Sequence, residues 1–233
     1  MGEPIHGVLF DKDGTLFDFE ATWNVWAAMM LTDLAAGDLN RAAALGARMG
    51  YDFVGRRFAP DSVVIAGTPD DIVQLLLPGV PDLTPDQLTD RLNSAAARAP
   101  QAEAVPLGPL IARLREMGLK LGVATNDAEA PARAHLAGVG HEGAFDFIAG
   151  YDSGFGGKPA PGMCLGFADA VGLAPETVLM VGDSTHDLHA GRAAGMRTVA
   201  VLTGMAAEAD LAPLATVVLP DIGHLPGWIA AQN

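Results

Sequence analysis

The feature that most constrains this chain is a short apolar run that stops at two carboxylates near the N-terminus. Residues Val8 to Phe10 are all apolar, which is typical of a buried parallel strand. The run ends at Asp11-Lys12-Asp13, and Gly14-Thr15 then predicts a turn. In open α/β sheets, reactive groups gather at the carboxyl ends of the strands. The stretch therefore indicates an α/β fold with a candidate site after its first strand, although an Asp-rich turn that caps a helix would give the same pattern.

Strand and helix patterns alternate over the second half of the chain. Apolar runs predict strands at 119–124, 145–149, 178–181, 198–202 and 216–219. Helical patterns precede or separate them, at about 110–117, 131–136, 162–171 and 188–194. Repeated strand–helix units predict a Rossmann-like, three-layer α/β core, with a mainly parallel sheet covered by helices on both faces.

The segment between the first two strands has a different character. Helical patterns are expected at 21–34, 39–49, 69–76 and 85–97, and Thr68-Pro69 and Thr84-Pro85 each resemble a helix start. Residues 50–67 are expected to form a loop with a short strand at 63–65. We therefore predict a core made of residues 1–18 and 100–233, interrupted by an inserted α-helical cap domain at residues 19–99.

Charge and composition limit the partners of the chain. Its 14 Lys and Arg residues against 28 Asp and Glu give a formal net charge of −14, which argues against nucleic acid or an anionic membrane as a partner. No apolar run approaches the length of a membrane span, and the N-terminus lacks a signal-peptide pattern. With a single cysteine, the chain is expected in the cytoplasm, as a monomer or homodimer.

Polar groups follow four of the predicted elements. They are Asp11 and Asp13, then Thr125-Asn126, then Lys158 in a loop, and finally Asp183 with Asp187. Each alone has an ordinary explanation, such as a helix cap or a solvated loop lysine. Because the carboxyl ends of parallel strands meet at one edge of the sheet, their joint occurrence favours a single crevice that collects all of them.

In this order the segments resemble the four motifs of the haloacid dehalogenase (HAD) superfamily. The first motif matches at residues 11–16, the second at Thr125-Asn126, the third at residues 157–161, and the fourth at Gly182-Asp183-x-x-x-Asp187. The closest resemblance is to the phosphoglycolate-phosphatase-like branch with a helical cap. That resemblance implies Asp11 as a nucleophile, Asp13 as an acid and base, and Mg²⁺ held by the fourth motif.

The residue types suit that chemistry. A phosphate monoester repels a carboxylate nucleophile, so attack by Asp11 requires positive charge, which a hard divalent cation with oxygen ligands supplies. Asp11, the Asp13 carbonyl and Asp183 are the expected ligands, and Asp187 is expected to bind the metal directly or through a water.

The remaining motif residues would act on the transferred group. Lys158 would pair with the phosphoryl oxygens and Asp11. The Thr125 hydroxyl and the Asn126 backbone N–H would donate hydrogen bonds to that group. Lys12 is expected to point away from the two carboxylates that flank it.

Residues of the insert would recognise the leaving group. Arg56 and Arg57 could meet a carboxylate or a second phosphate, or could simply be solvated. Trp23 could line the pocket or pack between the two domains.

The prediction is a Mg²⁺-dependent phosphatase of a small phosphorylated metabolite, with 2-phosphoglycolate as the leading substrate. The alternative is a phosphotransferase or mutase of the β-phosphoglucomutase kind, which is weakened because Phe19–Met30 lacks the histidine usual in those relatives. Asp13 argues against carbon–halogen cleavage, and the lack of lysine in the insert excludes Schiff-base chemistry there. A non-catalytic binding protein on the same scaffold is the third alternative.

Overall fold

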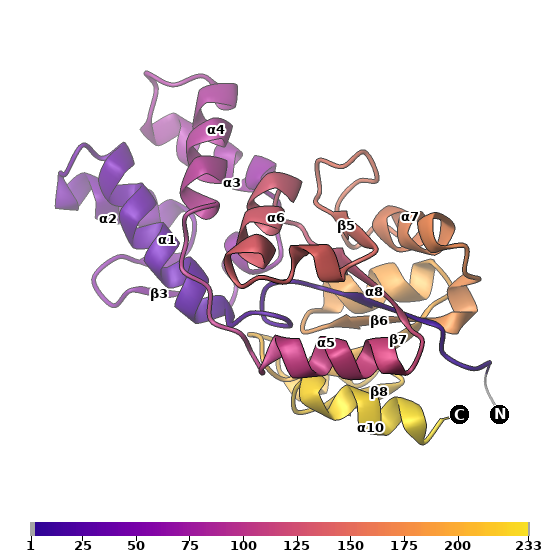
Figure 1. Cartoon of the computed structure of the whole chain (residues 1–233). Helices are drawn as coiled ribbons and strands as arrows, with labels where there is room; N and C mark the ends of the chain where they lie inside the picture. The colour runs from indigo at the N-terminus through magenta and orange to yellow at the C-terminus, as the bar shows by residue number, and fades with distance from the viewer. Residues whose placement is uncertain (1–2, 233) are drawn as a thin grey trace.

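A six-stranded sheet forms the centre of the computed structural model, which describes residues 3–232 (Figure 1). All neighbouring strands are parallel, in the order β5-β4-β1-β6-β7-β8. Their bounds are β1 Gly7–Phe10, β4 Lys120–Ala124, β5 Phe147–Ala149, β6 Val178–Gly182, β7 Arg197–Val201 and β8 Val217–Leu219. The predicted α/β core with a parallel sheet is confirmed.

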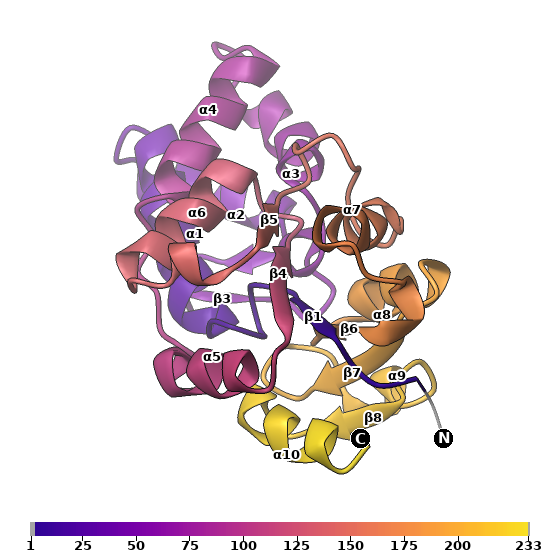
Figure 2. The same cartoon turned by 45° about the vertical axis from the view of Figure 1, so that its right-hand side comes forward.

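Helices cover both faces of the sheet, which gives three layers (Figure 2). Alternate side chains of β1 enter different apolar clusters, because successive residues of a strand face opposite sides. Phe10 packs with helices α5, α6 and α10, whereas Leu9 packs with α7 and α8. These helices are α5 Leu107–Glu116, α6 Glu129–Gly138, α7 Gly162–Val171, α8 Thr185–Ala193 and α10 Leu225–Ala230, with the short α9 Glu208–Leu211 beside α8.

Residues 19–99, called the insert below, form a helical unit between β1 and β4 (Figure 1). Its helices are α1 Phe19–Leu34, α2 Leu39–Arg48, α3 Pro69–Leu76 and α4 Pro85–Ala96. They pack around an apolar cluster of their own that includes Trp26, Leu31 and Leu88. Thr68-Pro69 and Thr84-Pro85 begin α3 and α4 as predicted, and Thr84 caps α4 by accepting a hydrogen bond from the Gln87 backbone N–H.

The segment between α2 and α3 differs from the prediction. Residues Val63–Ile65 form a 3₁₀ helix rather than a strand, because the Ser62 side chain caps the segment as it would a helix. A short antiparallel hairpin lies earlier, with β2 at Tyr51–Asp52 and β3 at Arg57–Phe58. Two-residue strands carry too little alternation to be recognised in a sequence.

The register of the central strands brings the predicted motifs to one edge. Phe10 pairs with Val123 on one side and with Val181 on the other. The residues that follow these positions therefore leave the sheet side by side, facing the insert. Across residues 3–232, no helix combines the length and apolar character that crossing a membrane requires.

Candidate active site

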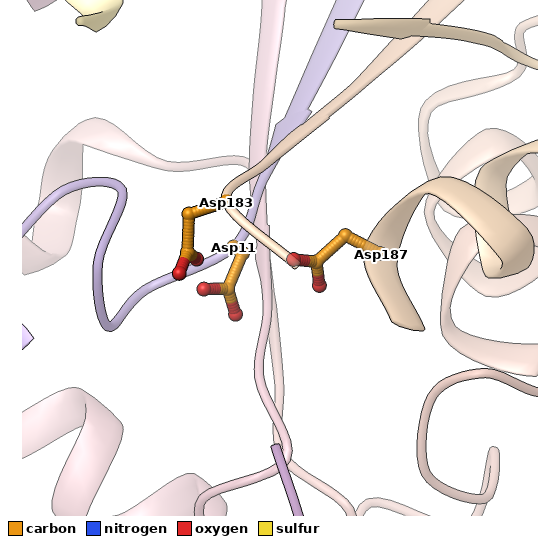
Figure 3. Close-up of side chains that lie close together, drawn as sticks. All are labelled: Asp11, Asp183 and Asp187. Carbon is orange, nitrogen blue, oxygen red and sulfur yellow. The ribbon is translucent and has the colours of Figure 1, made fainter. Parts of the chain in front are cut away.

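Three buried carboxylates meet at the carboxyl edge of the sheet (Figure 3). Asp11 follows β1, Asp183 follows β6, and Asp187 lies in the first turn of α8. One oxygen from each lies within 4.8 Å of the others, a spacing that a single cation can bridge. The expectation that these groups, far apart in the sequence, share one site is met.

The start of α8 fixes the orientation of Asp187. Ser184 caps the helix, and its backbone N–H and hydroxyl both donate to Asp187 Oδ2, at 3.0 and 2.7 Å. The other oxygen, Oδ1, accepts from Lys158 Nζ at 2.6 Å. Both oxygens of Asp187 are therefore engaged by protein groups, which suits it to hold Lys158 in place.

Lys158 brings a buried positive charge to the carboxylates. Its Nζ lies 2.5 Å from Asp11 Oδ1 as well as 2.6 Å from Asp187. Burial alone would lower the pKa of Lys158, but the two carboxylates raise it above its ordinary value. The side chain therefore remains an ammonium group at neutral pH.

One ammonium does not balance three carboxylates. Burial raises the pKa of Asp11 to about 7, despite the opposing effect of Lys158. Burial and the charge of Asp11 also raise the pKa of Asp183 well above its usual range. A further cation would relieve this excess of negative charge, so the residues present fit a divalent metal.

The backbone around Asp183 is shaped to leave room for its carboxylate. A Cβ atom on Gly204 would lie 1.6 Å from Asp183 Oδ2, and one on Gly14 would lie 2.5 Å from it. Thr15 Oγ1 donates to the other oxygen, Oδ1, at 3.3 Å. Thr203, the residue before Gly204, links the two glycines, because its Oγ1 donates a hydrogen bond to the Gly14 carbonyl at 2.6 Å. Only glycine permits this close approach from two sides.

Thr125 and Asn126 both line the pocket above the carboxylates. The Asn126 amide accepts from the Lys158 backbone N–H at 2.7 Å and donates to the carbonyls of Lys158 and Ala66, at 2.9 and 2.8 Å. The side chain therefore ties the Lys158 loop to the insert. The backbone N–H of Asn126 and the hydroxyl of Thr125 remain the predicted donors to a phosphoryl group.

Lys12 does not point away from its neighbours, which corrects the prediction. Its side chain is fully buried, and Nζ lies 2.7 Å from Asp13 Oδ2 and 3.3 Å from Asp127 Oδ2. The strand ends at Phe10, so strand alternation no longer governs the turn that follows. Lys12 and Asp127 are thus site residues that the sequence argument missed.

His135 on α6 extends this cluster to the insert. Its Nδ1 lies 3.0 Å from Lys12 Nζ, and its Nε2 lies 2.7 Å from the Ala96 carbonyl at the end of α4. An ammonium can only donate and a carbonyl can only accept, so these partners assign the proton to Nε2. Burial, followed by the charge of Lys12, lowers the pKa of His135 to about 4.

The insert closes one side of the pocket. Trp23 lines it, as predicted for one of its two roles, and Phe19, Trp26 and Ile72 lie on the same wall. Arg56 and Arg57 are exposed on the β2–β3 hairpin and are not among the residues that line the pocket. The structure therefore does not bring the two arginines to the site.

Comparison with known proteins agrees with this geometry. The family model of the haloacid dehalogenase-like hydrolases matches residues 5–195. The chain belongs to this family. It is 32% identical to a phosphoglycolate phosphatase of Rhodospirillum rubrum over 229 aligned residues. The alignment covers 95% of this chain and 90% of the relative. The chain is thus an enzyme of the phosphatase type, in the phosphoglycolate-phosphatase-like branch of the family.

Solved structures show the same fold. A crystal structure of a predicted phosphoglycolate phosphatase from Haemophilus somnus has a TM-score of 0.75 at 19% identity, and it covers 96% of this chain and 97% of that one. A HAD family hydrolase from Deinococcus radiodurans, solved with bound phosphate and sodium, has a TM-score of 0.63 at 26% identity, over 98% and 96% of the two chains.

Proposed function

We propose that this enzyme is a Mg²⁺-dependent phosphatase that hydrolyses a small phosphate monoester through an aspartyl-phosphate on Asp11. The observation that carries the proposal is the meeting of Asp11, Lys158 and Asp183 in one buried pocket. A nucleophile, a fixed positive charge and a candidate cation ligand are the parts that phosphoryl transfer needs.

Asp11 and Asp183 would hold the metal. In the described part of the chain, other side chains donate hydrogen bonds to Oδ1 of each carboxylate, and Oδ2 is left for a cation. Asp187, whose two oxygens are both engaged, would act by fixing Lys158 or through a metal-bound water. Mg²⁺, when bound, offsets the charge of the carboxylates and of the phosphate.

In the first step, an Asp11 oxygen attacks phosphorus, the P–O bond to the leaving group breaks, and the leaving oxygen takes a proton from Asp13. In the second step, the Asp13 carboxylate takes a proton from water as that water attacks the phosphorus of the aspartyl-phosphate. Asp11 is then regenerated and inorganic phosphate is released. Lys12 orients the Asp13 side chain, because its Nζ contacts both oxygens of Asp13.

We further propose that the insert, residues 19–99, acts as a cap on a catalytic core of residues 1–18 and 100–233. The pocket lies between the two, and Asn126 bridges them through the Ala66 carbonyl. Closure of such a cap would exclude water from the attacking carboxylate.

The proposal is tested by incubating purified protein with an aryl phosphate, with Mg²⁺ or with a chelator. We expect phosphate release only with Mg²⁺, and none from Asp11→Asn, which keeps the shape of the side chain but loses its nucleophilic charge. Full activity in Asp11→Asn, or in the presence of chelator, would refute the proposal.

The same assay separates the alternatives. 2-Phosphoglycolate, the substrate in the names of the relatives, is the first metabolite to assay. With a sugar phosphate, release of free phosphate indicates a phosphatase, whereas an isomeric sugar phosphate would indicate a mutase.

A further inference from the structure

The wall that the insert presents to the pocket is apolar except for the side chain of Asn93. The side chains that form most of it are Phe19, Trp23, Val64, Ile65, Ile72 and Leu92. Of the residues that the structure describes, the insert contributes no charged side chain to the pocket. The charged groups there all lie outside the insert, and most of them are carboxylates. A leaving group would therefore lie between acidic residues and an apolar wall.

The nearby positive charges already have partners. Lys158 is held by Asp11 and Asp187, and Lys12 is enclosed by Asp13 and Asp127. Among the described residues that line the pocket, no lysine or arginine lacks a carboxylate partner, and His186 is the one further side chain there that can carry a positive charge. Burying such a charge without a partner is strongly unfavourable.

Backbone donors at the start of α3 do not replace the missing side chain. Pro69, the first residue of that helix, has no N–H. The Thr68 N–H next to it already donates to Asp71 Oδ2 at 2.8 Å. Asp70 and Asp71 also place negative charge in the first turn, which opposes binding of an anion there.

The same wall carries polar side-chain groups, among them the amide of Asn93 and the indole N–H of Trp23. Trp23 is 7% exposed, and its indole Nε1–H has no hydrogen-bond partner within the described residues. Trp23 packs edge-on against Trp26, with ring centroids 5.1 Å apart and an interplanar angle of 80°. A buried donor on an aromatic wall suits a neutral organic group that carries an oxygen acceptor.

We propose that the substrate is the monophosphate ester of a neutral alcohol or phenol, whose uncharged organic part packs on the Phe19–Trp23–Ile72 wall and accepts a hydrogen bond from Trp23 Nε1. This inference rests on the proposed phosphatase function. It disfavours 2-phosphoglycolate and bisphosphorylated sugars, because both carry a second anionic group that would face this wall.

The test compares kcat/KM for two pairs of esters, in each of which one member carries a carboxylate on its organic part and the other does not, with Mg²⁺ present. The pairs are 2-hydroxyethyl phosphate against 2-phosphoglycolate, and phenyl phosphate against 4-carboxyphenyl phosphate. We expect the neutral member of each pair to be favoured about tenfold or more, as an unpaired buried charge demands. Equal values, or preference for the carboxylates, would overturn the inference and leave the phosphatase proposal standing. No hydrolysis of any of the four esters would overturn both.

A positive charge introduced into the apolar wall tests the same inference, and the same charge placed outside the pocket serves as its control. Ile65 lines the pocket and is only partly buried, so Ile65→Arg adds a guanidinium there without removing a fully buried side chain. Val54→Arg adds the same charge to the insert at a position that is 89% exposed and lies outside the pocket. We expect Ile65→Arg to shift both ratios toward the carboxylates and Val54→Arg to leave them unchanged. Unchanged ratios in folded Ile65→Arg would contradict the inference.

Trp23→Phe tests the hydrogen bond separately from the apolar contact, because it keeps a ring and removes the N–H. We expect kcat/KM to fall several-fold for 2-hydroxyethyl phosphate, whose free hydroxyl can accept the bond. The value for phenyl phosphate, which has no such oxygen on its ring, should change less. An equal fall for both substrates would show that Trp23 acts through packing alone and would overturn its role as a donor.

Discussion

Replacing Lys12 by methionine should destabilise the enzyme more than replacing any surface lysine. The Lys12 side chain is fully buried, and its ammonium contacts Asp13 and Asp127 at 2.7 and 3.3 Å. Burial alone would lower the pKa of Lys12, but the charges of these carboxylates raise it, so Lys12 is an ammonium group in the folded protein. Methionine preserves the length of the side chain and leaves both carboxylates without their cation.

The size of the effect follows from this burial. Removing one partner of a buried ion pair costs about 3–5 kcal/mol. We expect the lower end, about 3 kcal/mol, because the Asp13 side chain is 13% exposed at the pocket and can be partly hydrated. For a chain of this length, that corresponds to a fall in Tm of about 6–12 °C.

The loss should grow with pH. Burial already raises the pKa of Asp127 to about 6, against the lowering effect of Lys12, and removing Lys12 must raise it further. A carboxyl whose folded-state pKa exceeds its unfolded value binds more protons when folded, so stability falls as pH rises between the two values. The Lys12→Met deficit should therefore be larger at pH 8 than at pH 6.

The assay is urea unfolding of the metal-free protein at these two pH values, with Lys120→Met as the matched control. Lys120 is half exposed and lies 3.8 Å from Asp146, so its loss should cost less than about 1 kcal/mol. Adding Asp127→Asn to Lys12→Met should recover part of the loss, because it removes one orphaned charge. A Lys12→Met variant as stable as Lys120→Met at pH 8 would refute this reasoning.

Three further outcomes are expected. Because the pKa of His135 is lowered to about 4, His135 takes up a proton in the unfolded state at a higher pH than in the folded state. Urea unfolding should therefore show that the free energy of unfolding falls by about 2 kcal/mol from pH 7 to pH 5. His135→Gln should reduce this fall. Because Asp11 has a pKa of about 7 without a metal, calorimetry should show Mg²⁺ affinity falling up to about tenfold per pH unit below that value; a pH-independent affinity would contradict the assignment. Gly204→Ala should displace the Asp183 carboxylate and weaken Mg²⁺ binding, whereas Gly227→Ala, with no atom near its added Cβ, should bind Mg²⁺ normally.

The sequence predicted the sheet and most of the site because both depend on local patterns. Apolar runs that end in polar residues mark the strands, and parallel strands must present those ends at one edge. Asp11, Lys158, Asp183 and Asp187 therefore converge as predicted. Thr125 also lines the same pocket.

Features that depend on tertiary burial were not predictable in this way. A lysine in a sequence is normally taken as solvated, and nothing local shows that Lys12 is enclosed by Asp127 and His135, more than a hundred residues away. Arg56 looked suitable for an anion, but the hairpin holds it outside the pocket. The location in the cytoplasm and the oligomeric state stay predictions.

The measurement that tests the account most directly is the detection of a phosphoryl group on Asp11. In Asp13→Asn, an aryl phosphate should still phosphorylate Asp11, because its leaving group needs no proton, whereas hydrolysis of the aspartyl-phosphate should stall without the base. Acid quenching with Mg²⁺ present, followed by mass spectrometry, should then find the group on the peptide that contains Asp11, and should find none in Asp11→Asn. A phosphoryl group on another residue, or none in Asp13→Asn while phosphate is still released at the normal rate, would contradict the account.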